Sequence, residues 1–218
     1  YDKALDYYTR ALVISEDFGD KSVIGNCLNN IANVYSAKGD YDKALDYHTR
    51  TLVICNEIGE KTGIASSLNN IGNVYSAKGD YDKALDYYIR ALSIDERLGD
   101  KRGMVFSLYS IGVVYLRKGD YKKAENYLEK CLSIQKEIGL KVLKLETTTC
   151  HYLTYKHLGK EYDEKHLHSL IKDAENIGYK LNFTLYWLLD DTSYLETAYM
   201  QVQDEASVME EELGKTFL

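Results

Sequence analysis

The fold is decided by residues 21–60, which read KSVIGNCLNNIANVYSAKGDYDKALDYHTRTLVICNEIGE, because the residues that follow repeat them. Residues 61–100 read KTGIASSLNNIGNVYSAKGDYDKALDYYIRALSIDERLGD and are identical at 25 of 40 positions. A third copy, residues 101–140, keeps IGVVY, KGDY and CLSI, and residues 1–20 match the second half of a copy. A period of this length is typical of stacked supersecondary units, so the sequence predicts a repeat protein.

Each copy predicts two helices separated by a break. In residues 61–100 the apolar Leu68, Ile71 and Tyr75 follow helical spacing and form one stripe. Gly79 suits the left-handed conformation that ends a helix, and Asp80 is a good N-cap for the next one. A second apolar stripe follows and ends at another Gly-Asp pair. Each copy is therefore expected to be a helix hairpin that buries its apolar faces against neighbouring hairpins.

These residues resemble the tetratricopeptide repeat (TPR) family. Its signature matches Leu68, Ile71, Gly72 and Tyr75 of the first helix and Ala84, Tyr88 and Ala91 of the second. The resemblance implies an all-α fold, a right-handed superhelical solenoid of antiparallel helix hairpins, with a C-terminal capping helix. The 40-residue unit without Pro is similar to the repeats of Pins-type polarity scaffolds, kinesin light chain and bacterial TPR signalling proteins.

The expected organisation is a repeat array over residues 1–140, made of a half repeat (1–20) and full repeats at 21–60, 61–100 and 101–140. The small residues Ala44, Ala84 and Ala124 are expected to let paired helices approach closely, as are Ala32, Gly72 and Gly112 at a second site. Because the chain opens on a half repeat, we expect it to be part of a longer protein. The faces of Tyr8, Ala11 and Leu12 would then be open.

Residues 141–180 predict a divergent fourth hairpin. Its first helix would run over about 141–158, with Thr148 and His151 at apolar positions, and Tyr162 would take the place of Tyr121 after a one-residue slip. Glu164 and Lys165 stand where a small residue is expected, so these helices should lie farther apart than those of the second full repeat. An amphipathic second helix is indicated by Leu167, Leu170, Ile171, Ala174 and Ile177.

Residues 181–218 predict a C-terminal capping or coiled-coil-like helix. Residues 181–189 are nearly continuous apolar, and a stripe at spacings of 3 and 4 follows. A cap for the last hairpin is favoured over a partner helix that supports self-association through residues 195–213. The stripe consists of Leu195, Tyr199, Val202, Ala206, Met209 and Leu213.

Composition limits the classes of partner. A net charge of −7 and a pI near 5.3 argue against binding nucleic acid or an anionic membrane surface. No apolar run is long enough to span a bilayer. Cys27, Cys55, Cys131 and Cys150 lack metal-ligand spacing, and free thiols are in keeping with a reducing cytoplasm.

The sequence contains no constellation that predicts catalysis, a metal site or a cofactor. The glycines are helix stops rather than a phosphate loop. His166 and His168 are two residues apart on a predicted helix, which points them away from each other. His48 replaces the aromatic Tyr88 and is expected to be a packed side chain. The chain is therefore predicted not to be an enzyme.

The candidate function lies on a surface. In TPR arrays the concave face is lined by the first helix of each hairpin, and by resemblance its peptide-binding residues are those at the positions not used for packing. Carboxamides can both donate to and accept from a peptide backbone. Asn30 and Asn70, by contrast, are expected to bond neighbouring turns. The candidate residues are Asn29, Asn33, Ser36, Asn69, Asn73, Ser76, Phe106, Tyr109, Val113 and Leu116.

The third full repeat changes this groove, because Phe106, Tyr109, Val113 and Leu116 replace Ser66, Asn69, Asn73 and Ser76. A polar end and an apolar end would suit a peptide with backbone contacts at one end and aliphatic or aromatic anchors at the other. The Lys/Arg pattern that clamps acidic C-terminal tails is missing, with Arg117 the one obvious candidate.

Two functions remain open. The first is a non-enzymatic protein–protein interaction module that binds a peptide or helix of a partner protein. The second is the regulatory C-terminal TPR region of a larger bacterial signalling enzyme such as a nucleotide cyclase. The LGKEYD and MEEEL segments resemble the tails of large bacterial signalling proteins.

Overall fold

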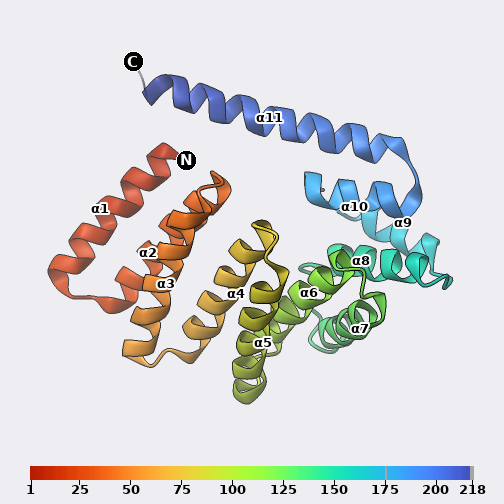
Figure 1. Ribbon diagram of the computed structural model, residues 1–218, viewed down its shortest axis with the longest axis horizontal. Coiled ribbons are helices and arrows are strands. Elements are labelled where there is room, and N and C mark those ends of the chain that lie inside the picture. The colour runs from red at the N-terminus through yellow and green to blue at the C-terminus, as the bar shows by residue number, and fades with distance from the viewer. Residues whose placement is uncertain (175, 217–218) are drawn as a thin grey trace. The chain divides into compact units, whose positions relative to one another are not determined.

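The computed structural model describes the backbone of residues 1–174 and 176–216, and their side chains as far as residue 207. Within these residues the chain has eleven helices and no strand (Figure 1), which confirms the all-α prediction. The chain forms two compact units, Tyr1–Val114 and Tyr115–Leu218. The helices are α1 (Asp2–Phe18), α2 (Lys21–Ala37), α3 (Tyr41–Ile58), α4 (Lys61–Ala77), α5 (Tyr81–Leu98), α6 (Lys101–Arg117), α7 (Tyr121–Glu137), α8 (Lys144–His157), α9 (Glu164–Lys172), α10 (Tyr179–Leu189) and α11 (Thr192–Thr216).

The first unit contains the helix hairpins that the repeat predicts. Helices α2 and α3 pair closely, as do α4 and α5, and α1 packs against α2. The predicted stops are confirmed, because Gly79 has φ +80° and Gly99 has φ +68°, which other residues rarely adopt. The predicted cap is also present, since the Asp80 carboxylate accepts a hydrogen bond from the Lys83 backbone N–H at 3.3 Å.

Small residues let the paired helices approach each other. Ala84 is fully buried, and Leu68 and Ile71 are each 2% exposed, so the predicted stripe forms the core. A second close contact joins Gly72 to Tyr88, because a Cβ atom on Gly72 would lie only 2.6 Å from the Tyr88 ring. The hairpin therefore depends on the absence of side-chain volume at two positions, as the sequence predicts.

Each full repeat also carries a stacked pair of tyrosines near the turn between its two helices. In the second, the Tyr75 and Tyr87 ring centroids are 5.5 Å apart at an interplanar angle of 12°, and Lys83 lies over Tyr75. The same stack joins Tyr35 to Tyr47 and Tyr115 to Tyr127. Aromatic pairs and cations over their faces each contribute about 0.5–1.5 kcal/mol.

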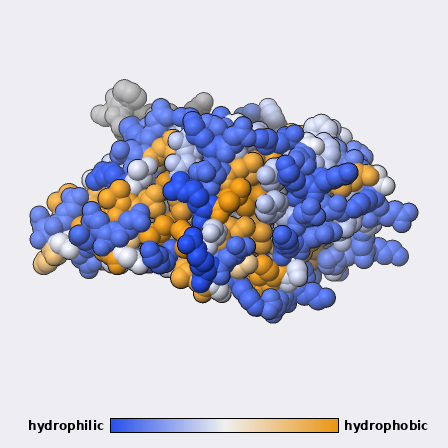
Figure 2. Space-filling view, turned by 60° about the horizontal axis from the view of Figure 1, so that its bottom comes forward, coloured by the Kyte–Doolittle hydropathy of each residue, from blue (hydrophilic) through white to orange (hydrophobic). Residues whose placement is uncertain are grey.

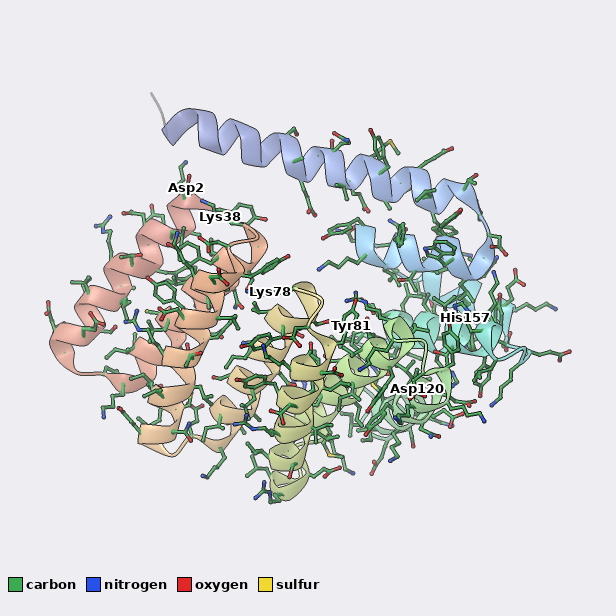
Figure 3. All side chains as sticks on the ribbon, viewed as in Figure 1. Asp2, Lys38, Lys78, Tyr81, Asp120 and His157 are labelled. Carbon is green, nitrogen blue, oxygen red and sulfur yellow. The ribbon has the colours of Figure 1, made fainter. Side chains whose placement is uncertain are left out.

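Ion pairs link consecutive hairpins in the first unit. Lys38 Nζ lies 2.7 Å from Asp2 Oδ1, and Lys78 Nζ lies 2.7 Å from Asp42 Oδ1. Figure 3 shows Asp2 and Lys38 together at one end of their helices, with Lys78 at the corresponding end of α4. Each lysine follows the first helix of a repeat and reaches the second helix of the preceding one, so the pairs recur with the repeat.

The exposed surface of α1 differs from the sequence expectation. Leu12 is 7% exposed, and Tyr8 and Ala11 pack with it against α2, so these faces are covered. The apolar side chains that do face solvent are Tyr7 and Ile14, which are 68% and 56% exposed. Hydrophobic surface is visible at this end of the first unit (Figure 2, left). The expectation was wrong because Leu12 points toward α2, the next helix, and not toward a preceding one.

In the second unit α8 packs against α7 and α10, and more sparsely against α9. Its apolar core consists of Leu153, Leu167, Leu185 and Leu188. The expected first helix of the fourth hairpin is shortened, since α8 begins at Lys144 rather than near residue 141. Leu143 precedes it with φ +60°, while Gln135 Nε2 donates to the Val142 carbonyl at 2.9 Å and holds the turn outside the helix.

The second helix of the fourth hairpin is also shorter than predicted. Helix α9 ends at Lys172, so Ala174 and Ile177 lie beyond it. The Ile177 carbonyl instead accepts from Asn182 Nδ2 and Gln201 Nε2, side chains of α10 and α11. Ile177 still packs with the apolar core, so its burial was predicted correctly and its helical state was not.

The register slip was also larger than predicted. Asp163 caps α9 as Asp120 caps α7, which is a separation of 43 residues instead of 40. Tyr162 therefore precedes the cap, whereas Tyr121 follows it and stacks on His157 at 4.4 Å; Asp120 and His157 are labelled in Figure 3. The predicted slip was one residue because Tyr162 and Tyr121 are the same residue type, whereas the turn before α9 is three residues longer.

Residues 179–216 form two helices, not the single C-terminal helix expected for 181–218. The break falls at Asp190, which has φ +56°. On α11 the packed residues are Ala198, which is 5% exposed, and Gln201, which bonds to Asn182. Of the expected stripe, Tyr199, Val202 and Ala206 are exposed and Leu195 is half-buried. The side chains of Met209 and Leu213 lie outside the described residues.

Candidate functional site

The candidate residues in the first unit lie on the first helices of the three full repeats, α2, α4 and α6. Two hydrogen-bonded contacts show that these helices are neighbours. Asn70 Nδ2 of α4 donates to Asn29 Oδ1 of α2 at 2.9 Å, and Asn69 Nδ2 of α4 donates to Ser107 Oγ of α6 at 2.9 Å. We call the surface that carries Asn29, Asn33, Asn69 and Asn73 the A-helix face.

Asn70 was expected to bond within its own helix, and this was wrong. It reaches the preceding repeat instead, because residues 29 and 70 face each other across the boundary between α2 and α4. Asn29 and Asn69 are thus both half-buried and engaged in contacts between repeats. Both side-chain polar atoms of Asn69 take part in its contact with Ser107, because Ser107 Oγ also lies 3.2 Å from Asn69 Oδ1.

Asn33 and Asn73 are the exposed carboxamides of this face. Asn73 Oδ1 accepts a hydrogen bond from the Tyr88 hydroxyl at 2.7 Å, which fixes the direction of its side chain. Ser36 and Ser76 are half-buried one turn further along their helices. Asn33 and Asn73 are 40 residues apart and occupy the same position of two successive repeats. Two equivalent carboxamides therefore stand on the neighbouring helices α2 and α4.

The apolar candidates of the third repeat differ in exposure. Phe106 is 42% exposed, while Tyr109 and Val113 are half-buried. Leu116 packs with the apolar core of the second unit, so it has a structural role beside the one that the sequence predicts. Phe106 is therefore the most accessible apolar side chain among the four.

A hollow of about 280 Å³ lies between α2, α3 and α4. It adjoins the A-helix face through Asn29 and is open beside Ser66, the position that Phe106 fills one repeat later. The sequence gives no signal for this site because its walls come from the ends of three helices. Its walls include Gly25, Asn26, Asn29, Ile54, Glu60 and Ser66.

Beneath the A-helix face lies a buried carboxyl group, Asp95 of α5. It is 1% exposed, and its Oδ2 accepts from the Ser107 hydroxyl at 3.2 Å. Ser107 in turn bonds to Asn69, so a hydrogen-bonded chain runs from Asp95 to the surface. Burial raises the pKa of Asp95 to about 6, opposed by the Ser107 hydrogen bond. The burial of Asp95 could not be predicted from the sequence, because a charged residue is usually exposed.

His48 is packed as predicted and is 1% exposed. Burial lowers its pKa to about 4, so the imidazole is neutral at physiological pH. Its Nδ1 has no hydrogen-bond partner among the described residues. The counterpart, Tyr88, bonds to Asn73, so the first full repeat lacks the contact that orients a surface carboxamide in the second.

His151 occupies a core position in the second unit and is 7% exposed. Its Nε2 lies 3.7 Å from Glu129 Oε1, which is too long for a hydrogen bond. Burial lowers the pKa of His151, and the charge of Glu129 partly offsets this. Among the described residues no cluster of three or more His, Cys, Asp or Glu side chains could hold a metal ion.

No helix within the described part of the chain is both long and apolar enough to cross a membrane. No curated protein matches the chain by sequence. Several solved structures share its fold. One is BtubC (BKLC) from P. vanneervenii, with 21% identity and a TM-score of 0.65, covering 79% of this chain and 70% of that one.

Two further structures match over most of this chain. A Rap protein complexed with Competence and Sporulation Factor has 21% identity and a TM-score of 0.74, and the match covers 95% of this chain but 59% of that one. Aspartyl phosphate phosphatase F from Bacillus subtilis has 16% identity and a TM-score of 0.70, covering 93% and 54%. This chain therefore spans little more than half of these two proteins.

The family comparison agrees with the hairpins and their caps. The model of the tetratricopeptide repeat matches residues 1–57 and 63–137, which is most of the chain. Repeats of this type generally serve as scaffolds for protein–protein interaction. The chain belongs to the tetratricopeptide repeat family.

Proposed function

We propose that the chain is a non-enzymatic module that binds an extended peptide of a partner protein on its A-helix face. The observation that carries this proposal is the exposed pair Asn33 and Asn73, which stand on α2 and α4, two of the helices that line the 280 Å³ hollow. Carboxamides can satisfy both the N–H and the C=O of a peptide backbone, and the hollow can receive one side chain. Phe106 supplies an apolar contact at the other end.

Similarity to a Rap protein that was solved in complex with Competence and Sporulation Factor supports a partner-binding role. The fold alone does not determine function, so the proposal rests on the surface residues. The buried cysteines are in keeping with a cytoplasmic location, which we propose with it.

The experiment is a selection of displayed random 12-residue peptides against the native chain. The same library is then tested on Asn33→Ala/Asn73→Ala/Tyr109→Ala and on a matched control, Asn56→Ala/Asn126→Ala, which alters exposed carboxamides on α3 and α7. We expect clones that bind the native and control chains and lose binding to the triple variant. A helical circular dichroism spectrum must be retained in all three.

Recovery of clones that bind the triple variant equally well would place the binding surface elsewhere. Failure to recover any clone would count against a peptide-binding function and favour the second hypothesis, a regulatory region of a larger signalling enzyme. An upstream reading frame that encodes a cyclase or ATPase domain would support that alternative directly.

Self-association through α11 is a separate proposal. Helix α11 packs on α10, with Ala198 buried and Gln201 bonded to Asn182, which supports the capping role. Beside this contact, Tyr199 and Val202 are 64% and 44% exposed. Sedimentation equilibrium should give a larger mass for the native chain than for Tyr199→Glu/Val202→Glu at high concentration. Equal monomer masses would leave capping as the only role of this helix.

A further inference from the structure

Asp95 is unusual among the residues at its position of the repeat. The equivalent residues are Ser15, Cys55 and Gln135, all buried and none of them acidic. Burying a carboxylate costs free energy unless it gains compensating interactions. Its charged neighbour is Asp100, the residue before α6, and this second negative charge also disfavours ionisation. Among the described residues, Asp95 at the junction between α5 and α6 is the buried carboxyl group at this repeat position.

The backbone of α6 leaves room for this carboxyl group. A Cβ atom on Gly103 would lie 2.6 Å from Asp95 Cγ and Oδ1, so any side chain there would collide with it. The preceding repeat has Gly63 against Cys55 in the same way, at 2.8 Å from the sulfur. Asp95 therefore sits in a space that fits a carboxyl group and holds it against Ser107.

The hydroxyl proton of Ser107 can be donated to one acceptor at a time. Its Oγ lies 3.2 Å from Asp95 Oδ2 and 3.2 Å from Asn69 Oδ1, while Asn69 Nδ2 donates to it at 2.9 Å. An ionised carboxylate is the stronger acceptor, because charge-assisted hydrogen bonds are about twice as strong as neutral ones. With Asp95 ionised, Ser107 donates inward and Asn69 Oδ1 is released.

We propose that Asp95 is a positioning residue, which turns the Ser107 hydroxyl away from Asn69 so that Asn69 offers its carbonyl oxygen to a main-chain N–H of a bound peptide. This rests on the proposed peptide-binding function. Asn69 is half-buried on the A-helix face, so part of its side chain is exposed on that surface. Asp95 itself does not touch the peptide.

Protonation reverses the chain of hydrogen bonds. Burial raises the pKa of Asp95 to about 6, so its carboxyl gains a proton as the pH falls below that value. The protonated carboxyl group donates to Ser107 Oγ, Ser107 donates to Asn69 Oδ1, and this oxygen is no longer free. The affinity for a peptide that uses Asn69 should therefore fall at acidic pH.

The first test needs no ligand. In ¹⁵N–¹H spectra, the side-chain amide signals of Asn69, assigned by their loss in Asn69→Ala, should shift with a midpoint near pH 6 in the native chain. They should not titrate in Asp95→Asn, which keeps the shape but cannot ionise. The amide of Asn70, bonded to Asn29, is the internal control. Signals of Asn69 that stay constant from pH 5 to 8 would overturn the proposal.

The second test uses a 12-residue peptide selected on the native chain. Its affinity should fall about tenfold between pH 7.5 and 5, the effect of one hydrogen bond. Ser107→Ala should abolish this dependence although Asp95 is retained, which a merely structural role of Asp95 would not predict. If the affinity does not depend on pH and the Asn69 signals do not titrate, the role of Asp95 is refuted. The proposed peptide-binding function is not affected by that result. Failure to select any peptide refutes the proposed function, and the spectra still decide whether Asp95 controls Asn69.

Discussion

At the scale of single residues, Asp95 is predicted to lower stability at neutral pH. Its folded-state pKa of about 6 exceeds the ordinary value of 3.8, so the folded chain binds this proton more tightly than the unfolded chain. The free energy of unfolding therefore decreases as the pH rises from about 4 to 6 and stays low above that. A residue kept at such a cost is a candidate for a functional role.

We expect Asp95→Asn to raise the free energy of unfolding by about 1–3 kcal/mol at pH 8, and to have little effect at pH 3.5. Urea denaturation at the two pH values measures this, with the exposed Asp46→Asn as the control. A variant that is less stable than the native chain at pH 8 would show that the carboxylate is stabilised by contacts stronger than the Ser107 hydrogen bond.

The pair Gly72 and Tyr88 is matched by Ala32 and His48 one repeat earlier. The smaller imidazole accompanies the larger Ala32, which fits the 2.6 Å approach that a Cβ on Gly72 would make to Tyr88. Gly72→Ala should thus destabilise the chain by about 1–3 kcal/mol through overpacking. Tyr88→His should cost less in that background than in the native chain, by about 1 kcal/mol in a double-mutant cycle. Additive effects would mean that the two residues do not compete for space.

At the scale of helices, Ala84 controls how closely α4 and α5 pack. It is fully buried, so Ala84→Leu should lower the free energy of unfolding by about 1–3 kcal/mol. Ala77→Leu, at the exposed end of α4, is the matched control and should change stability by less than about 0.5 kcal/mol. An unchanged melting midpoint for Ala84→Leu would show that the site is not tight.

The fourth hairpin shows how far sequence can predict a degenerate repeat. Helix α9 has only 9 residues and makes fewer contacts with its partner helix than α5 does, so the larger spacing expected from Glu164 and Lys165 stays a prediction. The buried positions Thr148 and His151 were found by register alone. The helix ends were not, because Leu143 and Ile177 are held by side chains of other elements, Gln135, Asn182 and Gln201. Such tertiary contacts leave no local signal.

In the candidate site, too, local sequence predicts some features, whereas contacts between repeats determine the others. The exposure of Asn33 and Asn73 could be predicted from the repeat because each position keeps its face of the helix. The bonds that Asn69 and Asn70 make with other repeats could not, since they depend on how neighbouring hairpins align. Asp95 was missed for a similar reason, because only the close approach of Gly103 explains how a carboxyl group fits there.

At the scale of the whole molecule, the two compact units are expected to unfold separately. The second unit has short helices and buried polar side chains such as Thr147, Thr154 and His151, so it should be the less stable one. The only tryptophan, Trp187, lies in α10 of that unit. Its fluorescence should change at a lower urea concentration than the circular dichroism of the whole chain. Coincident curves would indicate a single cooperative fold.

The repeat itself gives no sign of a division between Val114 and Tyr115, because the KGDY and KKAENY motifs continue the pattern across it. Local sequence determines each hairpin, whereas the division depends on contacts among several of them. The residues of α2, α4, α5 and α6 that the proposed peptide binding uses all lie in the first unit. Peptide binding therefore requires only that unit.

The central claim is that the A-helix face holds the ligand. The most direct measurement is the change in backbone ¹⁵N–¹H signals when a selected 12-residue peptide is added to the native chain. We predict that the shifted signals cluster on α2, α4 and α6, around Asn33, Asn73 and Phe106. Shifts concentrated on the second helices of the repeats, or on α10 and α11, would contradict the claim.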